Sequence, residues 1–434
     1  MPYQVLDLGP SRYPWRLSNS NVAVGWSWNA FAGGGNSGVI WNPNAALVHF
    51  PAALATKLWG VNEAGHSCGR RGDLIVGTYD WPASGANRHG FVRLADGTFF
   101  DLGPIVGEGL FSTLEDINNK GIAVGSKGEY ASPSLIKFDT QNPTAVIDMG
   151  GPDGWQAVHG QGINDKGEIA GVGSKHGEMR FFAHYDEVFH DLGPAGKTMM
   201  GKPNLWMSVR ITESGRIPAA VPLGVNDSEA AFFDLHGNGQ WQKLGLLSGA
   251  TSSVARDAND RGEVVGFCPQ GNDDGRAFLW WPEGGMHDLN WHLHPDTSQG
   301  WVLQMATGIN DVGHIVGLGT YYGAQHAFKL VPADQTPKFE GWATFQRILV
   351  GVIQDGGGVT WTPKGPRPVP PWGPLREEDW ALLNRAQQDV IAALTLLQAA
   401  SAFQDVASQR EQRQVAGVAL GRALERIMEG RNRG

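Results

Sequence analysis

Hydrophobic and polar residues alternate in short segments over most of the chain, which is the pattern expected of β-strands. Residues 155–164 alternate apolar with small or polar side chains, and the turn NDKG follows them. Three more segments are rich in β-branched and aromatic residues and are too short for helices, at 167–174, 178–185 and 187–193. Together the four segments predict one antiparallel sheet of four strands joined by tight turns.

The same unit recurs along the chain. The turn returns as VNEAG, INNKG, ITESG, ANDRG and INDVG, with a glycine-free relative, SNSN, near the N-terminus. If the turn asparagine, or the residue in its place, serves as a marker, seven markers lie 43 to 56 residues apart, at 19, 62, 118, 164, 212, 259 and 310. A sheet of four short strands cannot bury both faces alone, so the copies must pack on one another. A period of this length is typical of β-propellers.

The two ends of the repeat region complement each other. Residues 3–9, YQVLDLG, match the fourth strand of a unit and have no first three strands before them. The last unit begins near Trp301, ends in HAFKLVP and lacks a fourth strand. The sequence therefore predicts an all-β, seven-bladed propeller of four-stranded antiparallel blades over residues 1–331, closed by its N-terminal strand. Closure removes the exposed sheet edges that an open array would have.

At these residues the chain resembles the HAF-repeat proteins of bacteria, whose units read roughly IN-x-x-G-x-I-V-G, then H-A-F-x-W, then D-L-G. The best matches are INDVGHIVG with QHAFKL, and ANDRGEVVG with RAFLWW and HDLN. The resemblance covers about residues 4–331. It implies a propeller-like β architecture, often in exported proteins, and it implies no particular reaction and no catalytic residue set.

The repeat pattern stops after Val331. Residues 332–373 are interpreted as a linker with a β-hairpin and the proline-rich stretch KGPRPVPPWGP, which favours an extended spacer or docking segment. Residues 374–434 predict an amphipathic helical tail, with an apolar stripe that includes Trp380, Leu383, Val390, Leu394 and Leu397. Two interpretations of the stripe stay open: a two-helix appendage, or partner binding and self-association through residues 374–430.

Composition and charge narrow the possible partners. With 34 basic and 43 acidic residues the formal net charge is −9, which disfavours a duplex nucleic-acid partner. Cys68 and Cys268 are the only cysteines, so no disulfide framework is expected. The N-terminus lacks a signal-peptide pattern and no stretch suits a membrane span, so a soluble, cytoplasmic protein without membrane contact is expected. Export remains open if a signal was removed.

Long, aromatic loops are predicted on one face of the propeller, because the loops between second and third strands and the connections between blades emerge together. The short INxxG turns emerge on the opposite face. Aromatic platforms with polar neighbours suit a glycan or an extended peptide, so a recognition or scaffold protein is the first hypothesis, with no cofactor. The predicted ligand-binding residues are Trp26, Trp28, Trp81, Trp155, Trp206, Trp301 and Tyr321. The alternative for any single one of them is packing between blades.

Few motifs carry chemistry. His292 and His294 lie two residues apart near Asp296, a spacing that a loop can use for a metal, although a solvated loop explains it equally simply. The sequence contains no GxSxG, HExxH or P-loop motif. Two rival functions stay open: a propeller lyase or hydrolase acting on a polysaccharide or peptide, and a purely structural assembly protein.

Overall fold

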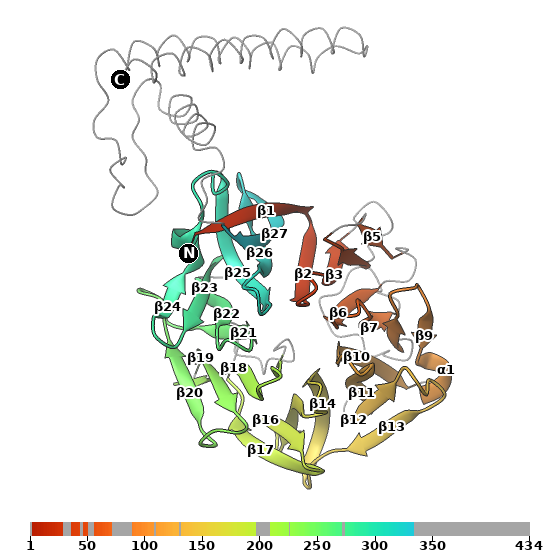
Figure 1. The fold of residues 1–434 in the computed structure, drawn as a ribbon. Helices are drawn as coiled ribbons and strands as arrows, with labels where there is room; N and C mark the ends of the chain where they lie inside the picture. Colours follow the sequence, from red (N-terminus) through yellow and green to blue (C-terminus); the bar gives the residue numbers. More distant parts are fainter. Residues whose placement is uncertain are drawn as a thin grey trace, which may run out of the picture. The chain divides into compact units, whose positions relative to one another are not determined.

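The propeller consists of seven small antiparallel sheets arranged as blades around one axis (Figure 1). The computed structural model divides the chain into two units, 1–333 and 334–434. It describes residues 2–28, 36–43, 47–50, 56–71, 89–107, 110–129, 132–196, 209–224, 226–270 and 274–333. The predicted linker at 332–373 lies outside these residues except for its first two positions, and the predicted helical tail at 374–434 lies wholly outside them.

Blades 1 to 4 each contain four strands that are paired in chain order. Blade 1 comprises β2 (Arg12–Leu17), β3 (Ala23–Trp28), β4 (Asn36–Trp41) and β5 (Val48–His49). Blade 2 comprises β6 (Lys57–Val61), β7 (Ser67–Arg71), β8 (His89–Arg93) and β9 (Phe99–Asp101). Blade 3 comprises β10 (Phe111–Ile117), β11 (Ile122–Glu129), β12 (Ser132–Asp139) and β13 (Val146–Gly150). Blade 4 comprises β14 (Trp155–Ile163), β15 (Ile169–Lys175), β16 (Glu178–Tyr185) and β17 (Val188–Pro194).

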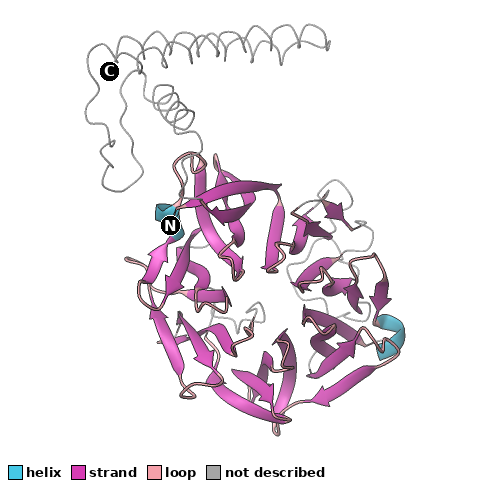
Figure 2. Ribbon diagram, viewed as in Figure 1, coloured by secondary structure: helices cyan, strands magenta, loops and turns pink. Residues whose placement is uncertain are grey.

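In blade 5 the described residues form three strands, and residues 197–208, which precede them, lie outside the described part of the chain. The three strands are β18 (Arg216–Leu223), β19 (Asp227–Asp234) and β20 (Trp241–Gly245). Blade 6 comprises β21 (Val254–Ala258), β22 (Val264–Gln270), β23 (Asp274–Trp281) and β24 (Gly285–Asp288). Blade 7 contains β25 (Trp301–Ile309), β26 (Ile315–Tyr321) and β27 (Ala324–Pro332). The described helices are short, α1 (Gly103–Val106) and the 3-10 helix η2 (Leu289–His292), as Figure 2 shows.

The N-terminal strand closes the ring as predicted. Strand β1 (Tyr3–Pro10) pairs antiparallel with β27, from Tyr3 opposite Pro332 to Pro10 opposite His326, and so becomes the fourth strand of blade 7. Its side chains alternate in burial, with Val5 6% exposed and Leu6 46% exposed. The two incomplete ends of the sequence thus form one blade, which protects the edge of β27.

The hydrophobic core lies between neighbouring blades. One cluster joins Phe181 of blade 4 to Ile217 of blade 5 and Val254 of blade 6. The phenylalanine of the HAF-like segment is fully buried in blades 2, 4, 6 and 7, at Phe91, Phe182, Phe278 and Phe328. The glycine opposite it in the second strand leaves room for its ring: a Cβ at Gly317 would lie 2.5 Å from Phe328. This contact explains why IVG and HAF recur together in the sequence.

The recurring turn asparagine connects the blades. In blade 3, Asn118 Oδ1 accepts a hydrogen bond from Ile122 N within its own turn, while Asn118 Nδ2 donates to the carbonyl of Asn164 in blade 4 at 3.0 Å. Asn62, Asn164, Asn259 and Asn310 each donate in the same way to the next blade, at 2.9 to 3.1 Å. The turn motif therefore joins blades as well as reversing the chain.

A second ring of hydrogen bonds follows from the residue after each marker. The backbone amide of this residue donates a hydrogen bond to the side chain of the equivalent residue in the next blade. In blade 5 the donor is instead the backbone amide of Ser214. The ring runs through Asn19, Glu63, Asn119, Asp165, Glu213, Asp260 and Asp311, and closes on Asn19. Asn19 therefore follows the marker of blade 1, and the marker itself is Ser18, whose amide bonds to Val22 O. The predicted marker at 19 was wrong by one residue.

This ring of carboxylates makes stability depend on pH at Glu213. Partial burial, with Asp165 and Asp260 nearby, raises the pKa of Glu213 from 4.5 to about 6. A carboxyl group whose pKa is higher in the folded than in the unfolded protein stabilises the fold at pH values below its unfolded pKa. This contribution is lost as the pH rises through its folded pKa. We expect Glu213→Gln to melt at a higher temperature than the wild type above about pH 6 and equally below about pH 4.5. Melting curves at pH 4 and pH 7.5 check this, and an equal difference at both would contradict it.

Candidate functional site

Each assigned first strand bulges near the axis. In blades 1, 2, 3, 4, 6 and 7 the register shifts by one residue three positions before the marker. A bulge redirects a side chain and is common next to binding sites. The bulged residues are of five types, and they are Trp15, Trp59, Glu115, Gln161, Arg256 and Thr307. The hub of an otherwise repetitive scaffold is therefore chemically varied.

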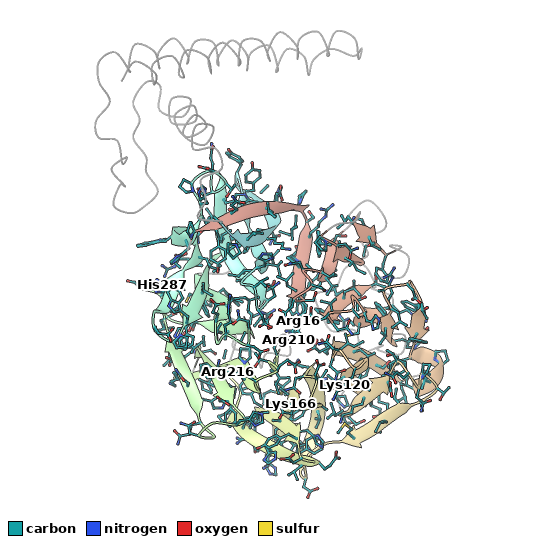
Figure 3. The ribbon with its side chains drawn as sticks, in the orientation of Figure 1. Arg16, Lys120, Lys166, Arg210, Arg216 and His287 are labelled. Atoms are coloured by element: carbon teal, nitrogen blue, oxygen red, sulfur yellow. The ribbon has the colours of Figure 1, made fainter. Side chains whose placement is uncertain are left out.

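Four charged residues two positions before their markers meet at the centre of the ring, and we name Arg16, Asp116, Arg210 and Asp257 the ionic plug. Arg16 lies 2.8 Å from Asp257 and 3.6 Å from Asp116, and Arg210 lies 3.7 Å from Asp116. Figure 3 places the labelled Arg16 and Arg210 together at the axis. Since these residues come from blades 1, 3, 5 and 6, the plug ties opposite sides of the ring together.

Arg210 has the most contacts in the plug. Its side chain is 2% exposed and donates to the carbonyls of Trp59 at 3.0 Å, Glu115 at 3.3 Å and Gln161 at 3.4 Å. Burial, together with Arg16, lowers the pKa of Arg210, and Asp116 opposes that shift. Burial also raises the pKa of Asp257. Both shifts arise because the charges lie away from water, where each depends on its partners.

On the loop-face side of the plug lies an aromatic cluster formed by Tyr13, Trp15, Trp26 and Trp59. The rings of Trp15, Trp26 and Trp59 have centroids 5.0 to 5.2 Å apart, and Tyr13 stacks on Trp26 at 5.5 Å. The first strands run from the loop face to the turn face, and Trp15 and Trp59 come one position before the level of the plug residues along these strands. The cluster therefore lies on the loop-face side. Trp26 and Trp59 are buried, whereas Trp15 and Tyr13 are partly exposed.

Cations lie against these rings. Lys57 Nζ is 4.7 Å from the centre of the Trp26 ring, the Arg256 guanidinium is 4.4 Å from Trp15, and that of Arg70 is 5.8 Å from Trp59. Burial and the nearby Arg210 lower the pKa of Arg256 to about 10, so it remains charged near neutral pH. The cluster thus offers flat apolar faces next to positive charge.

Two further groups belong to the first strands. Burial raises the pKa of Glu115, and Thr113 Oγ1 donates to its carboxyl at 2.6 Å. His159 Nδ1 lies 3.1 Å from Ser126 Oγ, and burial lowers the pKa of His159 to about 4. Ser126 is fully buried, and an imidazole with this pKa is a weak base at neutral pH. The pair therefore presents no activated nucleophile to solvent.

The four predicted ligand residues whose side chains the structure describes do not form one aromatic platform. Trp26 belongs to the aromatic cluster, whereas Trp301 and Tyr321 pack together in blade 7 at 5.0 Å. Trp155 packs edge-on against Phe182 at 6.0 Å, and Trp301 does the same with Phe328 at 6.3 Å. Trp155 and Trp301 occupy equivalent positions, as the first residues of β14 and β25, and the two phenylalanine contacts lie within their own blades. The remaining predicted side chains, those of Trp28, Trp81 and Trp206, lie outside the described part of the chain.

The predicted metal residues are not gathered into a site. His292 packs against Trp281 at 6.2 Å and His287 at 5.3 Å, while His294 Nδ1 lies 3.5 Å from Asp296. Within the described ranges, no group of three or more His, Cys, Asp or Glu residues is placed to hold a metal ion. The prediction fails because η2 ends at His292 and Leu293 is extended, so the two imidazoles have different neighbours.

Sequence reasoning did not select Trp15, Trp59, Arg256 or Glu115 as site residues. The signal was available in the aligned repeats, since the position three before the marker holds five residue types in the six blades whose first strand is assigned. The one-residue error in the marker of blade 1 hid it, because that error aligned Arg16 with Trp59. The predicted absence of a disulfide is consistent with Cys68 and Cys268, which are both buried free thiols.

Comparisons with known proteins add little to this description. No family model matches the chain, and no curated protein matches its sequence. Among the helices that the structure describes, none has the length and apolar character needed to cross a membrane.

Several solved structures match the chain at low similarity. TolB from Acinetobacter baumannii is 11% identical with a TM-score of 0.39, over 72% of this chain and 80% of that one. A puromycin-hydrolyzing peptidase from Mycobacterium tuberculosis is 13% identical with a TM-score of 0.46, over 78% of this chain and 55% of the peptidase. Prolyl oligopeptidase B from Galerina marginata is 9% identical with a TM-score of 0.40, over 64% and 42%. The chain thus spans about half of either peptidase, and these values support no argument about activity.

Proposed function

We propose that this protein is a recognition scaffold that binds a glycan or an extended peptide at the loop-face end of its hub. The observation that carries the proposal is the bulge position. Six blades place five different residue types there, with tryptophan in blades 1 and 2, although the turns and core positions around them repeat. A scaffold that needed only to close its axis would gain nothing from such variety, whereas a binding surface requires it.

The chemistry of the hub supports this ligand class. Trp15 and Tyr13 are partly exposed, and aromatic faces stack on sugar rings and pack against peptide side chains. Lys57 and Arg256 add positive charge beside these faces, and Glu115, the bulged residue of blade 3, adds a carboxyl group that interacts with Arg70. Since the ionic plug crosses the axis just beyond the cluster, a ligand that enters from the loop face ends its path there.

The resemblance to HAF-repeat proteins and the tail belong to the same proposal. The paired IVG and HAF contacts support a place among HAF-repeat propellers. The predicted helix at 374–430 would couple the propeller to a protein partner or to a second copy of the chain.

Trp15→Leu tests the proposed binding face. We expect about a tenfold or greater loss of affinity for the best ligand from glycan and peptide arrays, because a central aromatic anchor contributes more than about 1.4 kcal/mol. Trp155→Leu is the matched control, since it makes the same change in a tryptophan packed inside blade 4. Equal binding by Trp15→Leu and the wild type, with both folded by circular dichroism, would contradict the proposal.

A further inference from the structure

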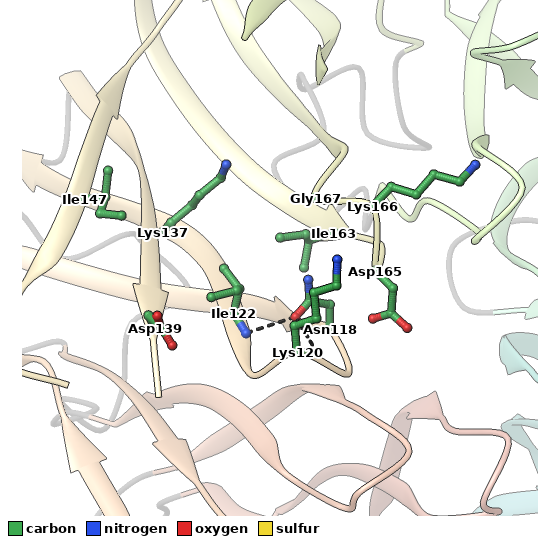
Figure 4. A pocket seen from close by; sticks show the side chains of 10 residues that line it. All are labelled: Asn118, Lys120, Ile122, Lys137, Asp139, Ile147, Ile163, Asp165, Lys166 and Gly167. Carbon is green, nitrogen blue, oxygen red and sulfur yellow. Dashed lines mark hydrogen bonds between the residues drawn. The ribbon is translucent and has the colours of Figure 1, made fainter. Parts of the chain in front are cut away.

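A second site lies on the opposite, turn face of the propeller, between blades 3 and 4. A cavity of about 220 Å³ opens there, and we name it the turn-face pocket (Figure 4). Blade 3 contributes one side and the turn of blade 4 the other. The lining residues are Asn118, Lys120, Ile122, Lys137, Asp139, Ile147, Ile163, Asp165, Lys166 and Gly167.

Positive charge dominates the pocket of this acidic protein. Three lysines and two aspartates line it, a formal balance of +1. Asp165 is already engaged, since it accepts from the backbone and side-chain amides of Asn119 at 2.7 and 2.8 Å, and Asp139 accepts from Gln141 N at 2.8 Å. Among the residues that the structure describes, none of the three lysines forms an ion pair with a carboxylate.

Lys137 occupies a position that five of the other six blades fill with apolar residues. It lies opposite Val124 in the third strand of blade 3. The residues at the same register position elsewhere are Ile40, Val92, Ala183, Phe232, Leu279 and Lys329. Blade 7 therefore provides the only other lysine at this position, and its surroundings can be compared directly.

Between blades 7 and 1, a side-chain amide oxygen accepts a hydrogen bond from Lys329. Lys329 Nζ donates to Asn21 Oδ1 at 3.4 Å, and Asn310 Nδ2 donates to the same oxygen at 3.1 Å. Asn21 is the last residue of the blade 1 turn and has a positive φ of 66°. The equivalent residue of every other turn is a glycine with positive φ, including Gly167 in blade 4, at 86°.

Between blades 3 and 4, this oxygen is missing. Gly167 replaces Asn21, and a Cβ built on Gly167 would meet nothing within 4 Å. At each of the other five turn glycines a side-chain atom lies within that distance. Lys137 and Asn118, the counterparts of Lys329 and Asn310, both line the pocket that results.

Asn118 retains an unused donor. In four marker asparagines the side-chain NH2 group has a second partner besides the carbonyl of the next blade. The second partner is His66 for Asn62, a glutamate for Asn164 and Asn259, and Asn21 for Asn310. Asn118 Nδ2 has one acceptor within the described part of the chain, the carbonyl of Asn164. Asn118 is 5% exposed, so its second amide hydrogen is available only to something inside the pocket.

We propose that the turn-face pocket binds the oxyanion group of a small organic anion. One oxygen of that group takes the place of Asn21 Oδ1 and accepts hydrogen bonds from Asn118 Nδ2 and Lys137 Nζ. Lys120 and Lys166 supply further charge at the rim, and lysine suits carboxylate and phosphate as a point charge. Ile122, Ile147 and Ile163 provide apolar walls for the rest of the ligand. This site is independent of the one proposed on the loop face.

Isothermal titration with four probes tests the chemistry. Phenyl phosphate and benzoate carry an oxyanion on an apolar ring, inorganic phosphate carries the oxyanion alone, and phenol carries the ring alone. We expect at least one of the two aromatic anions to bind more tightly than inorganic phosphate, phenol to be silent, and affinity to fall with added salt. The comparison of phenyl phosphate with benzoate identifies the preferred group. Failure of both aromatic anions to bind would overturn the proposal.

Two substitutions test the place of binding. Gly167→Asn supplies the oxygen that Asn21 provides in blade 1, and Lys137→Leu installs the leucine that blade 6 has at the same position. We expect each to weaken binding of the anion by about tenfold or more. Lys137→Leu removes a charge-assisted hydrogen bond to the anion, whereas Gly167→Asn supplies an amide oxygen that already accepts from the same donors. Both residues have natural precedents in this fold, so both variants should fold.

Matched controls lie on the same blades. Gly177→Asn makes the same change at a positive-φ glycine in the loop-face turn of blade 4, where a Cβ also meets open space. Lys127→Leu removes a lysine of blade 3 that pairs with Asp148 at 3.2 Å. Both controls should bind like the wild type. Unchanged binding by folded Lys137→Leu and Gly167→Asn, or equal losses in the controls, would place the anion elsewhere and reject the site.

Discussion

Replacing Arg210 with methionine should lower the free energy of unfolding by about 3–5 kcal/mol, the largest effect expected from a single residue of the hub. The substitution removes the donors to the carbonyls of Trp59, Glu115 and Gln161 and takes one cation from Asp116. Buried acceptors and a buried carboxylate would then lose their partners while still lying away from water. Urea titration followed by circular dichroism measures the change.

Arg216→Met is the control for this prediction. Arg216 makes the same kind of pair with Asp234, at 3.9 Å, but its side chain is 30% exposed. A solvent-accessible pair contributes at most about 1 kcal/mol, so this variant should unfold near the wild-type midpoint. Arg210→Lys should be intermediate, because it keeps the charge without the planar donors. If Arg210→Met cost no more than Arg216→Met, the plug would not hold the ring together.

Val5→Asp should open the ring and cost about 3 kcal/mol or more. Val5 is 6% exposed and packs in a cluster with Val265 of blade 6 and Leu303 of blade 7. A carboxylate there must either lose water without a partner or detach β1 from β27, and detachment leaves β27 as a free sheet edge. Hydrogen exchange of the β27 amides, together with the urea midpoint, measures both consequences.

Leu6→Asp makes the same chemical change one residue later on the same strand. Leu6 is 46% exposed, so its variant should keep β27 protected and shift stability by less than about 1 kcal/mol. Comparing the two variants separates the effect of burial from the effects of charge and of strand propensity. Equal exchange of β27 in both variants would mean that the N-terminal strand is not what closes the propeller.

The repeated scaffold was predictable because its physics is local. The turn residues, the IVG segment and the HAF segment each recur in the sequence, and each serves a contact within a blade or with the next blade, such as Gly317 under Phe328. Ring closure was predictable for a similar reason, since a unit lacking its first three strands and a unit lacking its fourth can complete each other. The tryptophans were less informative, because Trp155 and Trp301 each pack against a phenylalanine of their own blade.

Both proposed sites depended on comparing equivalent positions in three dimensions. Register showed that Ser18 is the marker of blade 1, which aligned Trp15 with Trp59 and Arg16 with Arg210. Packing of neighbouring blades brings Lys137 and Gly167 into one pocket and Lys329 to Asn21, pairs 30 and 308 residues apart in sequence. Local sequence thus determined the blade, its turns, its core and the closure of the ring. Only the tertiary structure decided which charges meet on the axis and which donors lack acceptors, because these contacts join different blades.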